Sequence, residues 1–365
     1  MIQQQIRFCR TPDGVRLAYA VAGSGPPLVK TANWLSHIEY EWQSPVWRHW
    51  YENLARHFTL IRYDQRGCGL SDWDVKSITF DSWVQDLECV VKAVGLEKFP
   101  LLGISQGGAV AVAYAKLYPK KVSHLILYGS YLRGRLNRNL KKQQVEETDV
   151  LINLIRLGWG SEKPAFRQVF TTLFIPDATL GQIQSLNELH KISTSAENAV
   201  KIVNCFDKID VSDLSARIET PTLILHSKDD ARVPFEEGRL AASLIPGAQF
   251  IMLESKNHIL LASEPAWQKF IKSILDFIDS KKDGIKKVKT FSKFSLLTHR
   301  EKQVLELIAQ GINNNEIAVQ LFVSPKTIRN HITNIFGKLE ISNRSKIIVM
   351  AREAGMGHGI EKFDK

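Results

Sequence analysis

The sequence has few cysteines and no long hydrophobic run. The four cysteines are scattered, without a Cys-x-x-Cys pair or histidines at metal-ligand spacing, which argues against both a zinc site and a disulfide scaffold. No stretch of about 18 apolar residues occurs, and the N-terminal residues lack the hydrophobic core of a signal peptide. A phosphate-binding loop is also missing. We therefore expect a cytoplasmic chain with no membrane segment, no bound metal and no nucleotide cofactor.

Positive charge is concentrated at the C-terminal end. The chain of 365 residues has a net charge of +10. Residues 281–365 contain 16 Lys and Arg against 8 Asp and Glu, so they carry most of this excess. A basic segment of this kind favours a negatively charged partner, such as double-stranded DNA. The first 280 residues are nearly balanced in charge and are long enough for one large core.

Short apolar segments alternate with longer helical segments in this larger part. Apolar runs that favour β-strands lie at residues 16–21, 27–30, 59–63, 99–104, 124–128, 222–226 and 249–253. The alternation predicts the α/β fold class, with a mostly parallel sheet covered by helices on both faces. A segment at about residues 133–218 breaks this rhythm, because it is helical in pattern and rich in charged and amide side chains. We expect it to form a helical cap over the sheet.

The segment GISQG places Ser105 between an apolar strand and an Ala-rich helix. A serine nucleophile in an α/β fold stands on a sharp strand-to-helix turn, which needs small residues on both sides. Gly103, Gly107 and Gly108 supply that room. We therefore predict that Ser105 is a catalytic nucleophile.

The other two members of a serine triad are expected after the serine, in the order Asp then His. Asp230 and His258 each follow shortly after a predicted strand, so both belong at the C-terminal edge of the sheet with Ser105. Asp229 is the competing carboxylate, but Asp230 keeps the Asp-x-x-Val-Pro spacing usual after this strand. The alternative is that these residues form a polar turn and a surface loop.

The oxyanion hole is the least regular part of this predicted site. In acyl-transfer enzymes, two backbone N–H groups hold the negative charge that develops on the substrate carbonyl. Trp34 and Gln106 occupy the positions of the two donors, but Ala32-Asn33 replaces the usual His-Gly pair. Asparagine tolerates a left-handed backbone better than most residues. Since the loss of one donor costs about a hundredfold to a thousandfold in rate, catalysis could have been exchanged here for ligand sensing.

Four tryptophans follow the predicted strand at 27–30. They are Trp34, Trp42, Trp47 and Trp50. They suit a pocket for a small apolar ligand such as an acyl chain, but tryptophans packed in an ordinary core are equally common, so both interpretations stay open. Lys30 and Thr31 are unusual residues for a buried central strand.

Together, these features resemble the α/β-hydrolase superfamily over residues 5–280. The segments TANWLSHIEYEW, RYDQRGCGLSD and GISQGGAVAVAYA are similar to those of a subgroup that is fused to regulatory or signalling output domains. The resemblance implies hydrolysis of esters, lactones or thioesters, or binding of such molecules, since some members of the superfamily are ligand receptors. The segment at 63–72 is similar to a structural turn of the same fold, and we assign it no chemistry.

The C-terminal part predicts a helix-turn-helix. Thr298 forms a Thr-x-x-Glu capping box with Glu301, and Gly311 ends the first helix. A short second helix leads to Ser324-Pro325, an N-cap followed by a proline at the first helical position. A third helix then runs to about residue 339.

This third helix is amphipathic. Its apolar face collects Ile328, Ile332, Ile335, Phe336 and Leu339. Its polar face collects Lys326, Asn330, Thr333, Asn334 and Gly337. Lysine suits phosphate or guanine and asparagine suits adenine edges, so this face can enter a major groove. The alternative is the solvated face of an ordinary helical bundle.

The whole segment resembles the LuxR-type helix-turn-helix, with the patterns TxRE, GxxNxEIA, SxKTIRNH and KLxISNR in place. The resemblance, together with the polar face, implies DNA contacts by Lys326, Thr327, Arg329, Asn330, Asn334 and Lys338. By the same resemblance, the last helix, at about residues 344–354, would pair two protomers through Ile348 and Ala351. A homodimer on a twofold operator is therefore expected.

The predicted organisation is a hydrolase-like domain at 1–280, a basic linker at 281–295 and a DNA-binding domain at 296–360. Two functions fit it. In the first, the chain is a transcription regulator whose hydrolase-like domain senses, and can hydrolyse, a small acyl or ester-type ligand. In the second, it is an active esterase, lactonase or thioesterase with an accessory DNA-binding domain. The altered oxyanion segment, and a linker able to relay dimer geometry, favour the first.

Overall fold

An eight-stranded mixed sheet forms the centre of the N-terminal part, in the order β1-β2-β4-β3-β5-β6-β7-β8. Strand β2 pairs antiparallel with β1 and β4, and every later pair in this order is parallel. The structure is a computed structural model that describes residues 2–294, 297–339, 341, 343–353 and 356. The strands are β1 Gln4–Arg10, β2 Arg16–Ala22, β3 Pro27–Lys30, β4 Thr59–Tyr63, β5 Phe99–Ile104, β6 Val122–Tyr128, β7 Thr222–Ser227 and β8 Gln249–Leu253.

The predicted α/β fold class is confirmed, and seven strands lie where the sequence places them. The sequence pattern does not predict β1, because this edge strand is polar and its side chains are only half-buried or exposed. By contrast, every residue of β5 and β7 is buried. Continuous burial is typical of central strands in a parallel sheet, which have neighbours on both faces.

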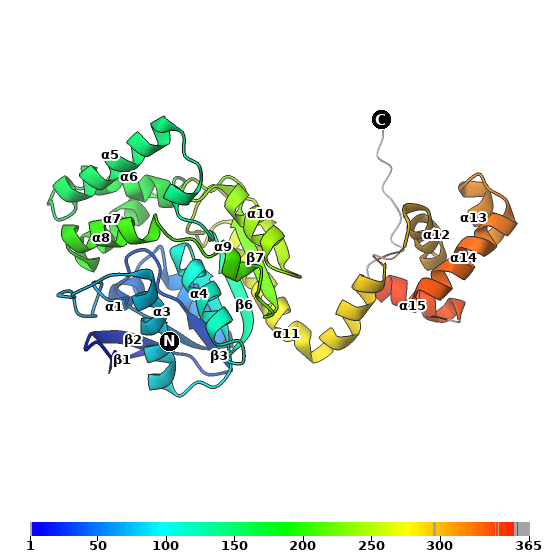
Figure 1. Cartoon of the computed structure of the whole chain (residues 1–365), viewed down its shortest axis with the longest axis horizontal. Coiled ribbons are helices and arrows are strands. Elements are labelled where there is room, and N and C mark those ends of the chain that lie inside the picture. The colour runs from blue at the N-terminus through cyan, green and yellow to red at the C-terminus, as the bar shows by residue number, and fades with distance from the viewer. Residues whose placement is uncertain (1, 295–296, 340, 342, 354–355, 357–365) are drawn as a thin grey trace. The chain divides into compact units, whose positions relative to one another are not determined.

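Helices pack against the sheet along its length (Figure 1). Helix α2 packs on β4, α3 on β1 and β2, α4 on β5 and β6, and α10 on β7 and β8. Local signals set their bounds: Thr79 caps the start of α3, and Gly95, with a φ of 75°, ends it. The helices outside the cap region are α1 Ile38–Glu41, α2 Arg48–His57, α3 Phe80–Val94, α4 Gln106–Leu117, α10 Phe235–Leu244 and α11 Pro265–Phe294.

The segment between β6 and β7, where the sequence predicts a cap, is helical. It contains a 3-10 turn at Arg135–Asn137 and the helices α5 Lys142–Gly158, α6 Ala165–Phe174, α7 Leu180–Ser193, α8 Ala196–Phe206 and α9 Ser212–Ser215. Helices α5 to α8 lie together beyond one end of the sheet, drawn in green in Figure 1. Phe174 of α6 and His190 of α7 line a cavity that also contains Ser105. These helices therefore lie against the predicted nucleophile.

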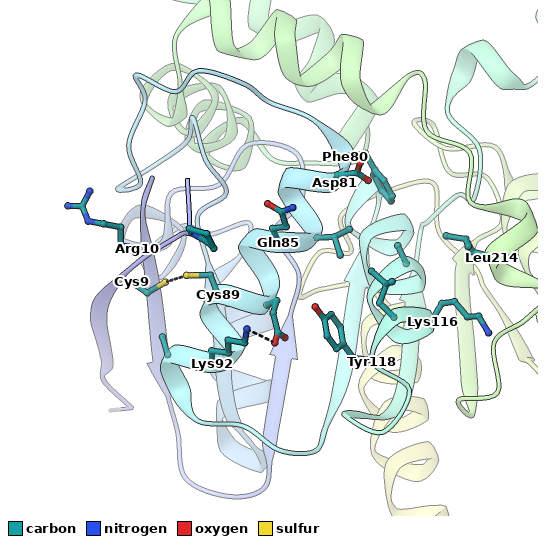
Figure 2. A pocket seen from close by; sticks show the side chains of 16 residues that line it. Cys9, Arg10, Phe80, Asp81, Gln85, Cys89, Lys92, Lys116, Tyr118 and Leu214 are labelled. Atoms are coloured by element: carbon teal, nitrogen blue, oxygen red, sulfur yellow. Dashed lines mark hydrogen bonds and ion pairs between the residues drawn. The ribbon is translucent and has the colours of Figure 1, made fainter. Parts of the chain in front are cut away.

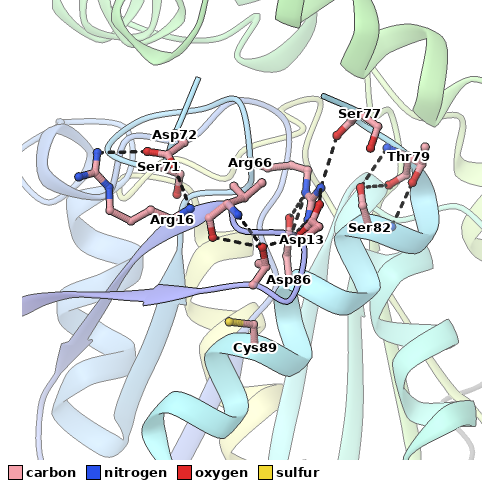
Figure 3. A network of polar contacts seen from close by, with 12 residues as sticks. Asp13, Arg16, Arg66, Ser71, Asp72, Ser77, Thr79, Ser82, Asp86 and Cys89 are labelled. Carbon is pink, nitrogen blue, oxygen red and sulfur yellow. Dashed lines mark hydrogen bonds and ion pairs between the residues drawn. The ribbon is translucent and has the colours of Figure 1, made fainter. Parts of the chain in front are cut away.

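The segment after β4, which the sequence identifies as a structural turn, is held by buried charges (Figure 3). The guanidinium of Arg66 lies 2.7 Å from the carboxylates of both Asp13 and Asp86. Asp64 is also buried, and one of its carboxylate oxygens accepts a hydrogen bond from the backbone N–H of Leu70 at 2.9 Å. These contacts satisfy polar groups inside the loop and so give the segment a structural role.

The chain divides into two compact units, Met1–Ile278 and Asp279–Lys365. Helix α11 continues through the predicted linker at 281–295 as far as Phe294, and residue 295 lies outside the described residues. The second unit contains α12 His299–Ala309, α13 Asn314–Gln320, α14 Pro325–Leu339 and α15 Arg344–Glu353. In the predicted DNA-binding domain at 296–360, residues 296, 340, 342, 354–355 and 357–360 also lie outside the description.

Candidate active site and DNA-binding helix

Ser105 stands at the sharp turn between β5 and α4, as the sequence predicts. Its backbone φ is 54°, a value that non-glycine residues rarely adopt. A Cβ atom on Gly103 would lie 2.6 Å from the Cα of Gly108, and one on Gly107 would lie 2.4 Å from the carbonyl oxygen of Ala32. Side chains at these two positions would collide with backbone, so the turn requires glycine on both sides of Ser105.

Asp230 and His258 meet at the C-terminal edge of the sheet. One Asp230 oxygen, Oδ2, accepts a hydrogen bond from His258 Nδ1 at 2.8 Å. Both side chains are buried. Burial alone would raise the pKa of Asp230, but the charge of His258 and its hydrogen bond outweigh burial and lower the pKa below its usual value. An ionised aspartate in this position fixes the orientation of the imidazole.

Asp229, the competing carboxylate, does not take part in this pair. It is exposed, and within the part of the chain that the structure describes its carboxylate makes no hydrogen bond or ion pair. Its backbone N–H donates to the carbonyl oxygen of Ser255 at 3.1 Å. The geometry therefore pairs His258 with Asp230.

The side chains of Ser105 and His258 line the same small cavity, which has a volume of about 10 Å³. His258 Nε2, the nitrogen opposite the Asp230 contact, is buried and has no hydrogen-bond partner among the described residues. In structures without substrate, catalytic hydrogen bonds are often long and tighten only in the complex. His190 lies in the same cavity, where burial lowers its pKa to about 3 and keeps it neutral at physiological pH.

One predicted oxyanion donor is already engaged. The backbone N–H of Trp34 donates to Oε1 of the Gln106 side chain at 2.8 Å. The Gln106 side chain thus occupies the place of a substrate oxygen at this donor, while its own Nε2 is buried without a partner in the described structure. In this segment the positive φ, 35°, falls on Leu35 and not on Asn33.

The two unusual residues of β3 support this loop. Lys30 is buried, and its Nζ donates to Asn33 Oδ1 and, at 3.2 Å, to the carbonyl oxygen of Thr31. The hydroxyl of Thr31 donates to the carbonyl oxygen of Gly107 at 3.0 Å. Burial lowers the pKa of Lys30 to about 8, and the nearby Glu41 carboxylate acts in the opposite direction. These polar side chains therefore connect the oxyanion segment to the start of α4.

We expect that Gln106→Ala raises kcat for ester hydrolysis about tenfold. The substitution removes the acceptor that now holds the Trp34 N–H and frees this donor for the substrate oxyanion. Loss of one such donor lowers the rate about a hundredfold to a thousandfold. Gln106→Glu is the matched control, because it keeps an acceptor and adds a negative charge next to the developing oxyanion. A rate that falls in the alanine variant would mean that the Gln106 side chain assists the reaction instead of competing with it.

The four tryptophans divide between the two interpretations that the sequence leaves open. Trp34 and Trp47 line the cavity next to Ser105. Trp50 is fully buried and packs against Phe270, with ring centroids 4.7 Å apart. Trp42 stacks on Tyr51 at 6.5 Å outside the cavity. Trp34 and Trp47 therefore border the cavity, whereas Trp42 and Trp50 serve only the packing of the fold.

A second cavity next to Ser105 has residues that the sequence patterns did not single out. It has a volume of about 20 Å³ and is lined by Trp34, Ser105, Gln106, Tyr131, Arg135, Arg138, Phe174, Phe206, Asp207, Arg232 and Val233. Of these, Arg232 follows the Asp230 position by only two residues, so the loop that carries the aspartate also carries a cation. No motif marks these arginines, because Arg232 comes from one segment and Arg135 and Arg138 from another, and the two segments meet only in the folded chain.

A groove of about 1030 Å³ lies elsewhere on the same unit (Figure 2). Residues of β1, α3 and α4 line it, including Cys9 and Cys89, whose Sγ atoms are 3.4 Å apart. Lys92 lies at its edge and forms an ion pair with Glu88 at 3.4 Å. None of the predicted triad or oxyanion residues lines this groove.

In the C-terminal unit, α13 and α14 form the predicted helix-turn-helix. The apolar face of α14 is packed, with Ile328, Ile335 and Leu339 buried in the core of this unit. Five of the predicted DNA contacts are exposed: Lys326, Arg329, Asn330, Asn334 and Lys338. Thr327 is half-buried, and its hydroxyl lies 2.8 Å from Ser324 Oγ within the N-terminal cap of the helix. The polar face of α14 is therefore open to a partner.

The predicted dimer helix needs a correction. Helix α15 lies within the predicted segment, but Ala351 is completely buried in the core of its own unit. It has no surface to offer to a second copy, so its assignment as a dimer contact is wrong; its small side chain instead allows the helices of the unit to approach each other. Ile348 is half-buried, and Val349 is 55% exposed.

Comparison with known families identifies both parts of the chain. Residues 40–265 match the family model of the alpha/beta hydrolase fold, and residues 295–351 match that of bacterial regulatory proteins of the luxR family. The first match covers more than half of the chain, so the protein belongs to the α/β-hydrolase fold family. It combines this domain with a C-terminal LuxR-type DNA-binding domain.

Individual relatives resemble the hydrolase part. The chain is 27% identical over 267 residues to the pyrrolizixenacetamide deacetylase of Xenorhabdus hominickii, across 72% of this chain and 94% of the relative. It is 26% identical over 268 residues to the AB hydrolase superfamily protein YisY of Bacillus subtilis, across 69% and 91%. The solved esterase from Exiguobacterium antarcticum has a TM-score of 0.63 at 23% identity, across 76% of this chain and 100% of the esterase. The similarity to the esterase structure shows the fold of the hydrolase part.

The described residues contain neither a candidate membrane helix nor a candidate metal-binding cluster. No helix in this part of the chain is both long and apolar enough to cross a membrane. Its His, Cys, Asp and Glu side chains form no group of three or more that could hold a metal ion.

Proposed function

We propose that the protein is a DNA-binding transcription regulator whose α/β-hydrolase domain binds a small ester-type ligand and hydrolyses it. Ser105 would be the nucleophile, His258 the base and Asp230 the residue that orients the base. The observation that carries this proposal is the buried hydrogen bond of 2.8 Å between His258 and Asp230, next to a cavity that also contains Ser105. It occurs in a chain with a LuxR-type domain, and we propose that the protein acts in the cytoplasm, on DNA.

In the proposed reaction, Ser105 Oγ attacks the ester carbonyl carbon while His258 Nε2 takes the hydroxyl proton. Asp230 stabilises the imidazolium that forms. The carbon–oxygen bond of the ester then breaks, and the alcohol leaves with the proton from His258. Water attacks the acyl group on Ser105, gives a proton to His258, and releases the acid as the proton returns to Ser105. The backbone N–H groups of Trp34 and Gln106 are the proposed oxyanion donors.

An acyl group is the proposed part of the ligand that lies near Ser105. The aromatic side chains of Trp34, Trp47 and Phe174 line the adjoining cavity. Their apolar surface suits a short hydrocarbon or acyl chain, because burying it removes both surfaces from water.

DNA binding is proposed to occur through the exposed polar face of α14. Arg329 and Lys326 are exposed cations, which suit phosphate oxygens or guanine, and Asn330 and Asn334 suit adenine edges. A homodimer would present two copies of α14 to the two halves of an operator. With Ala351 buried, the exposed Val349 and half-buried Ile348 are the apolar residues of α15 that a second copy could contact.

We expect that Arg329→Ala weakens binding to duplex DNA about tenfold and lowers the slope of log affinity against log salt by about one. Lys338→Ala gives the comparison at a second predicted DNA contact. Its Nζ forms an ion pair with Glu301 at 2.7 Å, so its charge is already partly neutralised and its loss should change affinity and slope less. Fluorescence anisotropy at several salt concentrations measures both. A larger effect at Lys338 than at Arg329 would contradict this assignment.

The second candidate is a serine hydrolase with an accessory DNA-binding domain. The arrangement of Ser105, His258 and Asp230 favours turnover. The hydrogen bond from the Trp34 N–H to Gln106 favours a slow enzyme or a receptor, because one oxyanion donor is occupied before substrate arrives.

The regulator proposal is tested by coupling between ligand and DNA. A duplex operator is selected by the full chain from random DNA, and its affinity is measured by anisotropy with and without p-nitrophenyl butyrate or decanoate. The Ser105→Ala variant is used so that the ester is not consumed. Typical allosteric coupling predicts a change in DNA affinity of about 5-fold to 150-fold.

The outcomes separate the two candidates. A change in DNA affinity supports a regulator that responds to the ester. An unchanged affinity, with ester hydrolysis by the wild type, overturns the regulator proposal in favour of the accessory-domain enzyme. An unchanged affinity without hydrolysis overturns both roles for the ester.

A further inference from the structure

The cavity next to Ser105 contains an arginine with no partner. Arg232 lines this cavity, and within the described parts of the chain its guanidinium makes neither a hydrogen bond nor an ion pair. Two aromatic rings lie close to it: the guanidinium carbon lies 5.8 Å from the ring centre of Phe174 and 5.9 Å from that of Phe206. Arg232 is half-buried, and a partly desolvated cation between aromatic rings is stabilised when an anion joins it.

The position of Arg232 is fixed by the catalytic loop. Its backbone N–H, and that of Val233, each donate to Asp230 Oδ1 at 2.8 Å. The other oxygen of the same carboxylate holds His258. The arginine is therefore placed relative to Ser105 by the same residue that would orient the catalytic base.

The neighbouring carboxylates are already engaged. Asp207 accepts two hydrogen bonds from Arg135, at 2.8 and 2.7 Å. Glu237 is shared by two arginines, with nitrogen–oxygen distances of 3.2 Å to Arg133 and 3.8 Å to Arg138. Of the charged residues that line the cavity, three are arginines, Arg135, Arg138 and Arg232, and one is a carboxylate, Asp207, so positive charge is in excess.

Arg232 keeps its charge under physiological conditions. Burial lowers its pKa, and the nearby Arg135 lowers it further, to about 10. This value is still well above neutral pH, so the guanidinium remains protonated. An uncompensated positive charge therefore lies in a cavity that also contains the predicted nucleophile.

We propose that Arg232 binds a carboxylate of the ligand, so that the ligand is an ester or lactone that carries a free acid group on its acyl side. A planar guanidinium matches a carboxylate with two parallel hydrogen bonds, and such charge-assisted bonds are strong where water is excluded. The aromatic walls would hold the hydrocarbon between the two ends. This inference rests on the proposed function of the Ser105 site and narrows its ligand from any acyl ester to an acidic one.

The test compares acidic esters with neutral esters of equal length. The full chain is assayed with mono-p-nitrophenyl esters of succinate, glutarate and adipate, against p-nitrophenyl butyrate, pentanoate and hexanoate. For at least one length, we expect kcat/KM of the wild type to favour the acidic ester about tenfold to a hundredfold, the range expected for hydrogen bonds to a charged group. Arg232→Gln should lose that preference mainly through KM and keep its rate on the neutral ester.

Two further variants separate binding from structure. Arg232→Lys keeps the charge without the planar fork and should recover part of the preference. Arg239→Gln removes an exposed arginine on α10 that pairs with Glu236 at 3.2 Å, and it should behave like wild type. A loss of activity on both esters in Arg232→Gln would overturn the proposal, because it would indicate a structural role.

Failure of the inference is distinct from failure of the proposed function. Turnover of neutral and acidic esters at equal rates by the wild type overturns the inference and leaves the hydrolase site intact. If no ester is hydrolysed, the melting temperature is measured with monomethyl glutarate and with methyl pentanoate. Stabilisation by the acid alone, lost in Arg232→Gln, supports the inference in a receptor. Stabilisation by neither compound overturns both the inference and the ligand-binding role.

Discussion

Replacement of Asp230 by asparagine is expected to lower kcat for p-nitrophenyl ester hydrolysis about ten-thousandfold. In the folded chain, Asp230 Oδ2 accepts the hydrogen bond of His258 Nδ1, while Oδ1 accepts the N–H groups of Arg232 and Val233. Asparagine can keep its oxygen on the backbone N–H groups, but it then presents an NH₂ group to the imidazole. The imidazole must carry its proton on Nε2, so it cannot take the proton of Ser105.

The neighbouring Asp229→Asn variant is the matched control. Asp229 is exposed, and the same chemical change there should leave kcat within about twofold of wild type, because surface substitutions away from special contacts have small effects. Circular dichroism of both variants checks that the fold is kept. If Asp230→Asn retained most of the wild-type rate, the proposed role of the His258–Asp230 pair would be lost.

The stability of the Asp230→Asn variant relative to wild type is expected to depend on pH. Folding lowers the pKa of Asp230. A carboxyl of this kind stabilises the fold above its unfolded pKa of about 4, and this contribution is lost as the pH falls through the lower folded value. The stability difference between wild type and Asp230→Asn should therefore be largest near neutral pH and shrink below about pH 4. Urea unfolding at pH 7 and at pH 3 measures this difference.

Replacement of Glu41 by alanine is expected to destabilise the hydrolase domain by about 3–5 kcal/mol. The Glu41 carboxylate lies 2.7 Å from the guanidinium of Arg62, and the two side chains are 2% and 3% exposed. The Arg62 guanidinium also lies over the ring of Tyr51, 4.0 Å from its centre, and donates to Gln4 at 2.7 Å. Loss of the carboxylate leaves a buried positive charge whose remaining contacts are neutral.

Urea unfolding followed by tryptophan fluorescence measures this effect in the intact chain. All eight tryptophans lie within residues 1–278, so the signal reports on the hydrolase domain. Glu236→Ala, which breaks the exposed pair with Arg239, is the control and should cost less than about 1 kcal/mol. The double variant Glu41→Met with Arg62→Met should recover most of the loss, because it removes both buried charges. Equal costs for Glu41→Ala and Glu236→Ala would contradict the importance of burial.

Much of the fold could be predicted because its signals are local. The continuous apolar run at β5, the glycines around Ser105 and the capping residues of α3 and α12 each act within a few residues. β1 could not be predicted in the same way. Its polar sequence is held as a strand by antiparallel pairing with β2, and that pairing is a property of the assembled sheet.

The same distinction between local and long-range signals applies to the candidate site. Ser105, Asp230 and His258 could be proposed from their order and from their positions after strands. The contact between the Gln106 side chain and the Trp34 N–H could not, because the two residues are 72 positions apart and no pattern links their side chains. The burial of Ala351 also could not be predicted from the sequence, because an alanine on an amphipathic helix suits either a core or an interface.

By itself, the sequence determined the two-part organisation, the α/β and helix-turn-helix classes, and the positions of the serine turn and the amphipathic α14. These depend on periodicity, capping and turn residues, which act over short distances along the chain. Only the tertiary structure decided that an oxyanion donor is occupied, and that the described residues provide no side-chain partner for Arg232 in the cavity that Ser105 lines. Those features depend on side-chain distances between segments far apart in sequence, and such distances are set by packing of the whole domain.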